Sequence, residues 1–277
     1  MNSNTFSIRR IAMLAGFYWP VIRIQLVIAA VVVAACYLIS IFSVSMVYAN
    51  GDDPGLYMAL YSMFISGGNL VYCSGPLIFA WCAQRAIATT LPASWTEKTT
   101  FMLGYVFILF PAFLAIVWYG LTGIFSFFTP YAAPVQAMMG VLAEQVGDQM
   151  GIIDKLTNTT RPSNLASCAM IASLACFAVA SVRRNRLAMG VLAIFGGMAL
   201  NWLAGVFISV MAFLHSDSLM GVVENPGAAA SEQLGNQIAS EIITMMSDMM
   251  PVYGIICAII AVTMAALTAY RIKTRQN

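Results

Sequence analysis

Charged side chains are scarce in this sequence. Asp, Glu, Lys and Arg make up 9% of the 277 residues, whereas hydrophobic residues make up 61%. Soluble domains carry about 25% charged residues, so the composition excludes one or two soluble globular domains. The segments between the apolar stretches are too short to form a hydrophobic core of their own. We therefore expect one membrane domain with loops.

Several motifs that carry chemistry are also missing. The chain has one histidine, His215, and neither a His-Glu-x-x-His sequence nor a cysteine pair at metal-ligand spacing, which argues against a metal enzyme. The Gly-x-x-x-x-Gly-Lys-Ser/Thr phosphate loop is absent, so ATP hydrolysis by that route is excluded. No stripe of basic and aromatic residues suggests a nucleic-acid partner. We expect no catalytic activity and no cofactor.

The sequence is instead dominated by six apolar stretches. Each is long enough to cross a hydrocarbon core of about 30 Å as a helix. The predicted spans cover residues 24–49, 56–83, 101–128, 163–182, 187–214 and 250–270. The predicted fold class is all-α: a polytopic membrane protein with six transmembrane helices, in which residues 23–277 form a single domain.

The few charges are divided between the two sides of the predicted membrane. Eleven of the 13 Lys and Arg residues flank one side, and ten of the 11 carboxylates flank the other. Only Lys155 and Arg161 are basic residues on the acidic side. The positive-inside rule then places both termini in the cytoplasm.

The interiors of the spans contain no Asp, Glu, Lys or Arg. Proton- and ion-coupled carriers use titratable groups within the bilayer, so this absence argues against a secondary carrier. The six cysteines lie in the spans or at their edges, where a thiol packs as a small apolar group. They are Cys36, Cys73, Cys82, Cys168, Cys176 and Cys257.

The amino-terminal segment, residues 1–22, interleaves Arg9 and Arg10 with aromatic and aliphatic residues. This pattern predicts an interfacial helix on the cytoplasmic face, with a frayed, charged tail as the alternative. Pro20 is expected to interrupt that helix before the first span begins.

Two longer segments on the acidic side, 130–162 and 231–249, carry apolar residues at three- and four-residue spacing. This periodicity predicts amphipathic helices. Neither is long or apolar enough to span a membrane, so we expect both to lie on the outer surface or to dip partly into the bilayer.

Spans two and five share small residues and amides. Glycine lets transmembrane helices approach closely, and a proline kinks them. A mid-membrane amide requires a partner, which predicts that Asn69 faces protein or a cavity. The residues predicted to form such kinks or packing sites are Gly67, Gly68, Asn69, Pro76, Gly196, Gly197 and Asn201.

The cytoplasmic link between spans two and three, residues 85–98, carries the only carboxylate on the basic side, Glu97. Ser94 and Glu97 have the spacing of a capping box, which predicts that a helix starts at Ser94. With a short helix before Pro92, the link would form a helix-turn-helix that projects from the membrane. Glu97 beside Lys98 could also be no more than a solvated pair.

The run Leu91-Pro92-Ala93-Ser94, followed by Glu97-Lys98, resembles the corresponding link in small bacterial permeases of type 2 ABC exporters, especially those of Bacteroidetes. In that family the link is a coupling helix that docks on the ATPase. The resemblance implies coupling roles for Arg85, Leu91, Pro92, Ser94, Glu97 and Lys98. It also implies a separate cytoplasmic ATPase subunit, a homodimer or a heterodimer with a sister permease, and the bacterial inner membrane.

Apolar spans suit an amphipathic, lipid-like or peptide cargo better than an ion. The long outer segment 130–162 departs from the family pattern, in which that connection is commonly short. An alternative hypothesis is therefore an integral membrane protein that does not transport. Such a protein would act by binding a partner, as an immunity, sensor or assembly subunit, through its outer helices.

Overall fold

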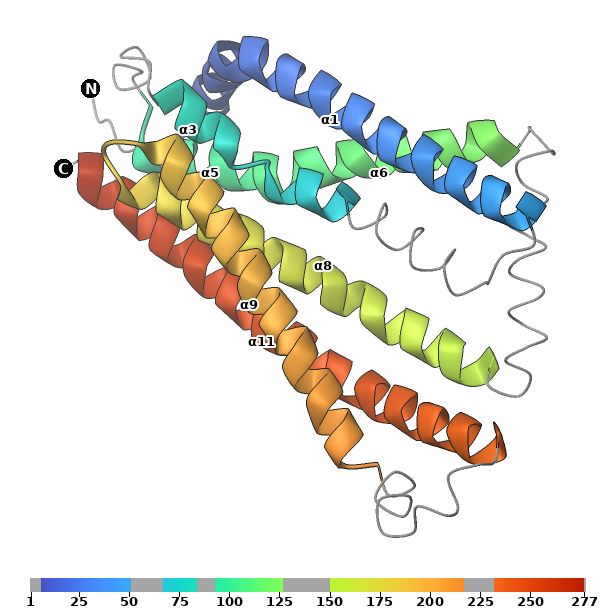
Figure 1. The fold of residues 1–277 in the computed structure, drawn as a ribbon. Coiled ribbons are helices and arrows are strands. Elements are labelled where there is room, and N and C mark those ends of the chain that lie inside the picture. The colour runs from blue at the N-terminus through green and yellow to red at the C-terminus, as the bar shows by residue number, and fades with distance from the viewer. Residues whose placement is uncertain (1–5, 51–66, 84–92, 127–149, 217–231, 277) are drawn as a thin grey trace.

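The structure of the chain is a computed structural model that describes residues 6–50, 67–83, 93–126, 150–216 and 232–276 (Figure 1). The regular structure in these ranges is entirely helical. Five helices are long and apolar enough to cross a membrane: Ile8–Ile39, Trp95–Ile124, Pro162–Ser181, Arg186–Leu214 and Thr244–Thr274. The chain is thus a polytopic, all-α membrane protein. The remaining predicted span, 56–83, lies only partly within the described residues.

The first helix, α1 (Ile8–Asn50), continues through Pro20. The predicted interruption between an interfacial segment and the first span is therefore wrong. A proline ring inside a helix collides with the carbonyl of the residue four positions earlier, which here belongs to Gly16, a position with open space around it. The first turns of α1 run in a different direction from the rest of the helix in Figure 1, so the proline bends the helix without ending it.

The predicted outer helices are not separate elements either. Helix α8 (Met150–Ser181) continues through Pro162, and α11 (Glu232–Gln276) continues through Pro251. The described parts of 130–162 and 231–249 are helical as predicted, but they extend the fourth and sixth spans. The two helices support each other where their prolines lie, because the Ser163 hydroxyl donates to the Met250 carbonyl over 2.7 Å.

Helix α8 is the centre of the molecule. In its most apolar stretch 61% of the residues are buried, against 17% to 28% in the other four candidate spans. It contributes Cys176 and Val179 to one core, with α1, residues 67–83 and the third span, and Cys168 and Ile171 to another, with α9 and α11. Small side chains let α8 approach its neighbours closely. The cysteines within these cores pack as apolar groups, as predicted.

Helices α8 and α9 (Arg186–Leu214) form a tight antiparallel hairpin. Its turn ends at Asn185, whose φ of 54° lies in the left-handed region that asparagine tolerates. The Arg186 Nε donates to the Val182 carbonyl over 3.0 Å and so caps the end of α8. At its other end, α9 is followed by an exposed His215.

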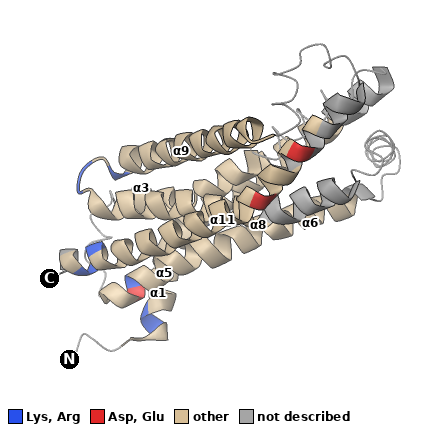
Figure 2. Ribbon diagram, turned by 90° about the horizontal axis from the view of Figure 1, so that it is seen from below, with Lys and Arg blue, Asp and Glu red and all other residues tan. Residues whose placement is uncertain are grey.

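The charge division predicted from the sequence is confirmed within the described residues (Figure 2). One end of the molecule, called the basic end below, gathers the Lys and Arg residues whose side chains the structure describes, with Glu97 among them, whereas Glu241 and Asp248 lie toward the other end. The side chains of Lys155 and Arg161 lie outside this description. The assignment of the basic end to the cytoplasm stays a prediction.

The two glycines predicted to pack span five behave differently. A Cβ atom on Gly197 would lie 3.1 Å from the Ile171 Cγ1 of α8, whereas one on Gly196 would meet nothing within 4 Å. Replacing Gly197 with leucine is therefore expected to lower the free energy of unfolding by about 1–3 kcal/mol through overpacking. The adjacent Gly196→Leu is the matched control and should leave thermal unfolding in detergent unchanged. Equal effects would contradict the assignment of Gly197 to the interface.

Candidate functional site

The second span is broken rather than kinked. A helix over residues 67–73 ends at Ser74-Gly75-Pro76, and α3 (Leu77–Ala83) begins after it. Pro76 has no backbone N–H, and the Gly75 N–H turns back to the Tyr72 carbonyl at 3.1 Å. Pro76 was predicted to kink this span, and the structure shows a three-residue turn at 74–76 between two helices in place of a kinked helix.

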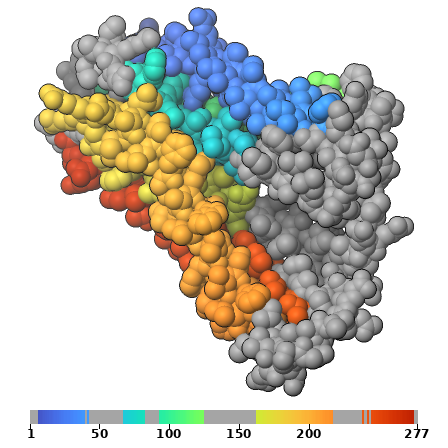
Figure 3. Space-filling model, in the orientation of Figure 1, coloured from blue at the N-terminus to red at the C-terminus, as the bar shows by residue number. Residues whose placement is uncertain are grey.

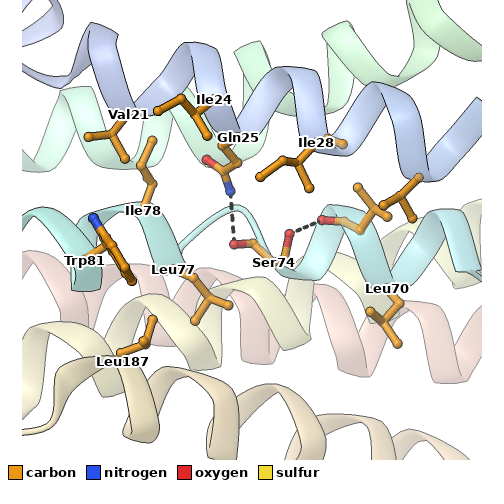
Figure 4. Close-up of a pocket in the computed structure, with 13 residues that line it drawn as sticks. Val21, Ile24, Gln25, Ile28, Leu70, Ser74, Leu77, Ile78, Trp81 and Leu187 are labelled. Carbon is orange, nitrogen blue, oxygen red and sulfur yellow. Dashed lines mark hydrogen bonds between the residues drawn. The ribbon is translucent and has the colours of Figure 1, made fainter.

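A side chain from another helix binds the backbone carbonyls at this break. The Gln25 amide of α1 donates to the carbonyls of Ser74 and Gly75 at 3.2 and 3.4 Å (Figure 4). Its Oε1 accepts a hydrogen bond from the Tyr105 hydroxyl at 2.8 Å. The Ser74 carbonyl also accepts from the Leu77 N–H at 3.0 Å, so Gln25 matters most for the Gly75 carbonyl. Hydrocarbon offers no partner for a free carbonyl, and Gln25, held by Tyr105, supplies one.

The third span carries a matching irregularity. Between α5 (Trp95–Gly104) and α6 (Phe110–Ser126), the turn Tyr105–Leu109 is π-helical. In an α-helix two residues five positions apart would point about 140° away from each other, but the wider turn brings Tyr105 and Phe110 together, with stacked rings 5.7 Å apart. A Cβ atom on Gly75 would lie 2.9 Å from the Phe110 Cδ1. The π turn thus directs both rings to the break.

We call Gln25, Tyr105, Phe110 and the break 74–76 the hinge cluster. It joins α1, the second span and the third span within the apolar part of the molecule. Polar side chains at this depth and π-helical turns both occur preferentially at functional sites. A cavity of about 600 Å³ opens beside the cluster, lined in part by Gln25 and Ser74.

The residues of the predicted coupling link form a second cluster at the basic end. The capping box is confirmed: the Ser94 N–H donates to the Glu97 Oε2 at 2.9 Å, and the Glu97 N–H donates to the Ser94 hydroxyl at 3.4 Å. The other carboxylate oxygen of Glu97 accepts from the Ser7 N–H at 2.8 Å and pairs with the Arg10 Nε at 3.0 Å.

Glu97 is 0% exposed. The interpretation of Glu97 and Lys98 as a solvated pair is therefore wrong, because the carboxylate lies inside and ties the start of α5 to the start of α1. The neighbouring Trp95 ring lies 5.4 Å from the Lys273 Nζ of α11, which adds the end of the last helix to the same corner. We call Ser7, Arg10, Ser94 and Glu97 the corner cluster.

The other predicted site residues are more dispersed. Arg85, Leu91 and Pro92 lie outside the described residues. A Cβ atom on Gly67 would touch the Cys36 Sγ at 3.0 Å, whereas Gly68 has open space. The side chain of Asn69 is half-buried.

Asn201 is not a simple packing residue, since its side-chain oxygen accepts a hydrogen bond from the Tyr253 hydroxyl of α11. The sequence analysis missed Gln25 and Tyr105. Gln25 could have been found as an amide among the apolar residues of the first span.

The bonds of Gln25 predict a measurable loss of stability. Interhelical hydrogen bonds in membranes contribute about 0.6–1.7 kcal/mol each. Gln25→Leu removes the bonds to Tyr105 and to the break, so we expect thermal unfolding to show a loss of about 1–2 kcal/mol. Tyr105→Phe removes only one of them and should cost less. A Gln25→Leu protein as stable as the wild type would show that the amide does not support the break.

Compared with protein-family models, curated proteins and solved structures, the chain has no match in any of the three.

Proposed function

We propose that the chain is the permease subunit of an ATP-driven ABC exporter, with ATP hydrolysis on a separate cytoplasmic subunit. The observation that supports this proposal is a double connection. Helices α1 and α5 meet at the corner cluster, through Arg10 and Glu97, and α1 meets the same span again just after α5, through Gln25 and Tyr105.

A displacement of the predicted link 85–98 would act on both connections. Its last residues, Ser94 and Glu97, are bonded into the corner cluster. From Glu97 the helix runs about 12 Å to Tyr105, at 1.5 Å per residue, and ends at the hinge cluster. Packed helices transmit a shift from one discrete contact to the next. The break in the second span is the element that would change its arrangement.

The proposal includes an ATPase that docks on the link and a second permease copy or sister permease. Its cargo would be amphipathic, lipid-like or a peptide, in keeping with the apolar spans. The buried position of Glu97 changes which residues could form the docking surface. The ATPase would contact other residues of the link, while Glu97 would hold the link to the membrane domain.

The test is purification of the tagged chain from native membranes in a mild detergent, with mass spectrometry of what accompanies it. We expect a P-loop ATPase in stoichiometric amount. Leu91→Ala should lower its recovery about tenfold, the effect of losing about 1.4 kcal/mol of contact energy. Arg184→Gln, at the other loop of the basic end, is the control and should retain it.

Gln25→Leu separates docking from transport. This variant should still recover the ATPase, but its cargo-stimulated ATP hydrolysis in proteoliposomes should fall several-fold because the hinge cluster no longer responds. A preparation free of any ATPase, from cells that express the partner genes, would contradict the proposal. It would favour a membrane protein that acts by partner binding.

A further inference from the structure

The cavity beside the hinge cluster is an elongated groove between α1, residues 70–81 and the first turn of α9 (Figure 4). Its volume is about 600 Å³, and its lining is apolar apart from Gln25 and Ser74. Both polar side chains already bond within the protein, Gln25 to the break and Ser74 to the Val71 carbonyl. The groove therefore offers hydrocarbon contacts and no polar group that requires a ligand.

The length of the groove matches one leaflet of a bilayer. It follows α1 from Val21 to Val32, which corresponds to about 16 Å at 1.5 Å per residue, and half of a hydrocarbon core is about 15 Å. This length suits a single hydrocarbon chain.

One end of the groove lies at the basic end of the molecule. Figure 4 shows Val21, Trp81 and Leu187 together at that end, with Ile28 and Leu70 farther along. Trp81 is 51% exposed, and tryptophan favours the depth of lipid headgroups.

Leu187 is the second residue of α9, close to the turn 182–185. In that turn Arg183 and Arg184 are exposed, and they come four and three residues before the groove residue Leu187. Clustered cations at a membrane surface attract anionic lipids.

We propose that this groove binds one acyl chain of an anionic phospholipid from the leaflet at the basic end, with the phosphate beside Arg183 and Arg184. The lipid would fill the space next to the break and would cover Ile28 and Leu70, which are 58% and 49% exposed. This inference does not depend on the exporter proposal. A resident lipid would pack against the hinge cluster in a protein of any function.

The first experiment locates the acyl chain of the bound lipid. The purified protein is reconstituted with phosphatidylglycerol that carries a diazirine in one acyl chain, irradiated and mapped by mass spectrometry of its peptides. Labelling should concentrate on residues 21–32 and 70–81. Ile28→Trp, which fills the groove, should lower it about fivefold or more. Leu192→Trp, at a 64% exposed site on α9 outside the groove, should leave it unchanged.

The second experiment tests the headgroup. Unlabelled phosphatidylglycerol should compete with the photolabel more effectively than unlabelled phosphatidylcholine. Arg183→Gln and Arg184→Gln should each reduce this preference about fivefold, as expected for about 1 kcal/mol per basic residue at a membrane surface. Arg271→Gln, an exposed cation on α11, is the matched control. Circular dichroism confirms that each variant is folded.

Three results would overturn the proposal. Labelling spread evenly over the exposed face of α9 would show that the groove is not distinguished from ordinary lipid contact. Absence of label from 21–32 and 70–81 would show that protein covers the groove, as in an assembly of copies. Equal competition by the two lipids, in wild type and arginine variants alike, would exclude an anionic headgroup.

Discussion

Replacing Glu97 with alanine is expected to lower the free energy of unfolding by about 2–3 kcal/mol, the contribution of hydrogen bonds to one charged group. The substitution removes the acceptor for the Ser7 and Ser94 N–H groups and leaves Arg10 without its carboxylate. A deeply buried ion pair would lose about 3–5 kcal/mol when one partner is removed. The side chain of its partner Arg10 keeps 24% of its surface exposed, so the smaller figure applies.

Thermal unfolding with a thiol-reactive dye would measure this loss, because Cys73, Cys82, Cys168 and Cys176 are buried and become reactive only on unfolding. Lys98→Ala, one residue away and half-buried, is the control and should shift the midpoint little. Glu97→Gln should fall between the two, since an amide can still accept one of the hydrogen bonds. A Glu97→Ala protein that unfolds like Lys98→Ala would contradict the corner cluster as a brace.

Replacing Gly254 with leucine is expected to be at least as damaging, with a loss of about 3 kcal/mol, the upper part of the range for overpacked cores. A Cβ atom at Gly254 would lie 2.9 Å from the Ser163 Oγ and 3.1 Å from the Ser163 Cα. The backbone of α8 cannot yield as a flexible side chain does. The two helices would separate, and the Ser163 bond to the Met250 carbonyl would break with them.

Gly120 of α6 provides the matched control, since it is exposed and a Cβ atom there would meet nothing within 4 Å. Gly120→Leu should unfold at the wild-type temperature in the same dye assay, while Gly254→Leu should unfold well below it. If Ser163→Ala alone reproduced the full effect of Gly254→Leu, the hydrogen bond rather than the close approach would be the main contribution.

The membrane fold follows from local properties of the sequence, and the site does not. The length of an apolar run is enough to predict a membrane span. The spacing of Ser94 and Glu97 is enough to predict the helix start at Ser94. Glu97 also joins α5 to α1, through Ser7 and Arg10, which are about 90 positions away in the chain. No rule based on residue spacing predicts a tertiary contact of this kind. The partners of Gln25 also lie in two other spans, so its amide stands out in the sequence but its contacts do not.

The prolines show where local rules fail in a membrane. Pro20, Pro162 and Pro251 lie inside continuous helices, whereas Pro76 follows a break. A transmembrane helix tolerates a proline when neighbouring groups satisfy the freed backbone. Pro76 differs because it follows Gly75 and because Gln25 supplies hydrogen bonds to the open turn. The outcome is decided by the neighbours of each proline, which the sequence alone does not identify.

The central position of α8 has a consequence for how the protein is made. Its inward face carries Ser163, Ser167 and Ser173, all buried by other helices. When α8 leaves the ribosome, α11 is still to come; synthesis from Ser181 to Gln276 takes about 5–20 s at 5–20 residues per second.

During that interval Ser163 lacks its partner, the Met250 carbonyl of α11, and the earlier spans and α9 must hold α8 in the bilayer. A chain truncated before α11 would keep this hydroxyl-bearing face open to lipid. Such a chain is a natural target for the proteases that clear unassembled membrane proteins.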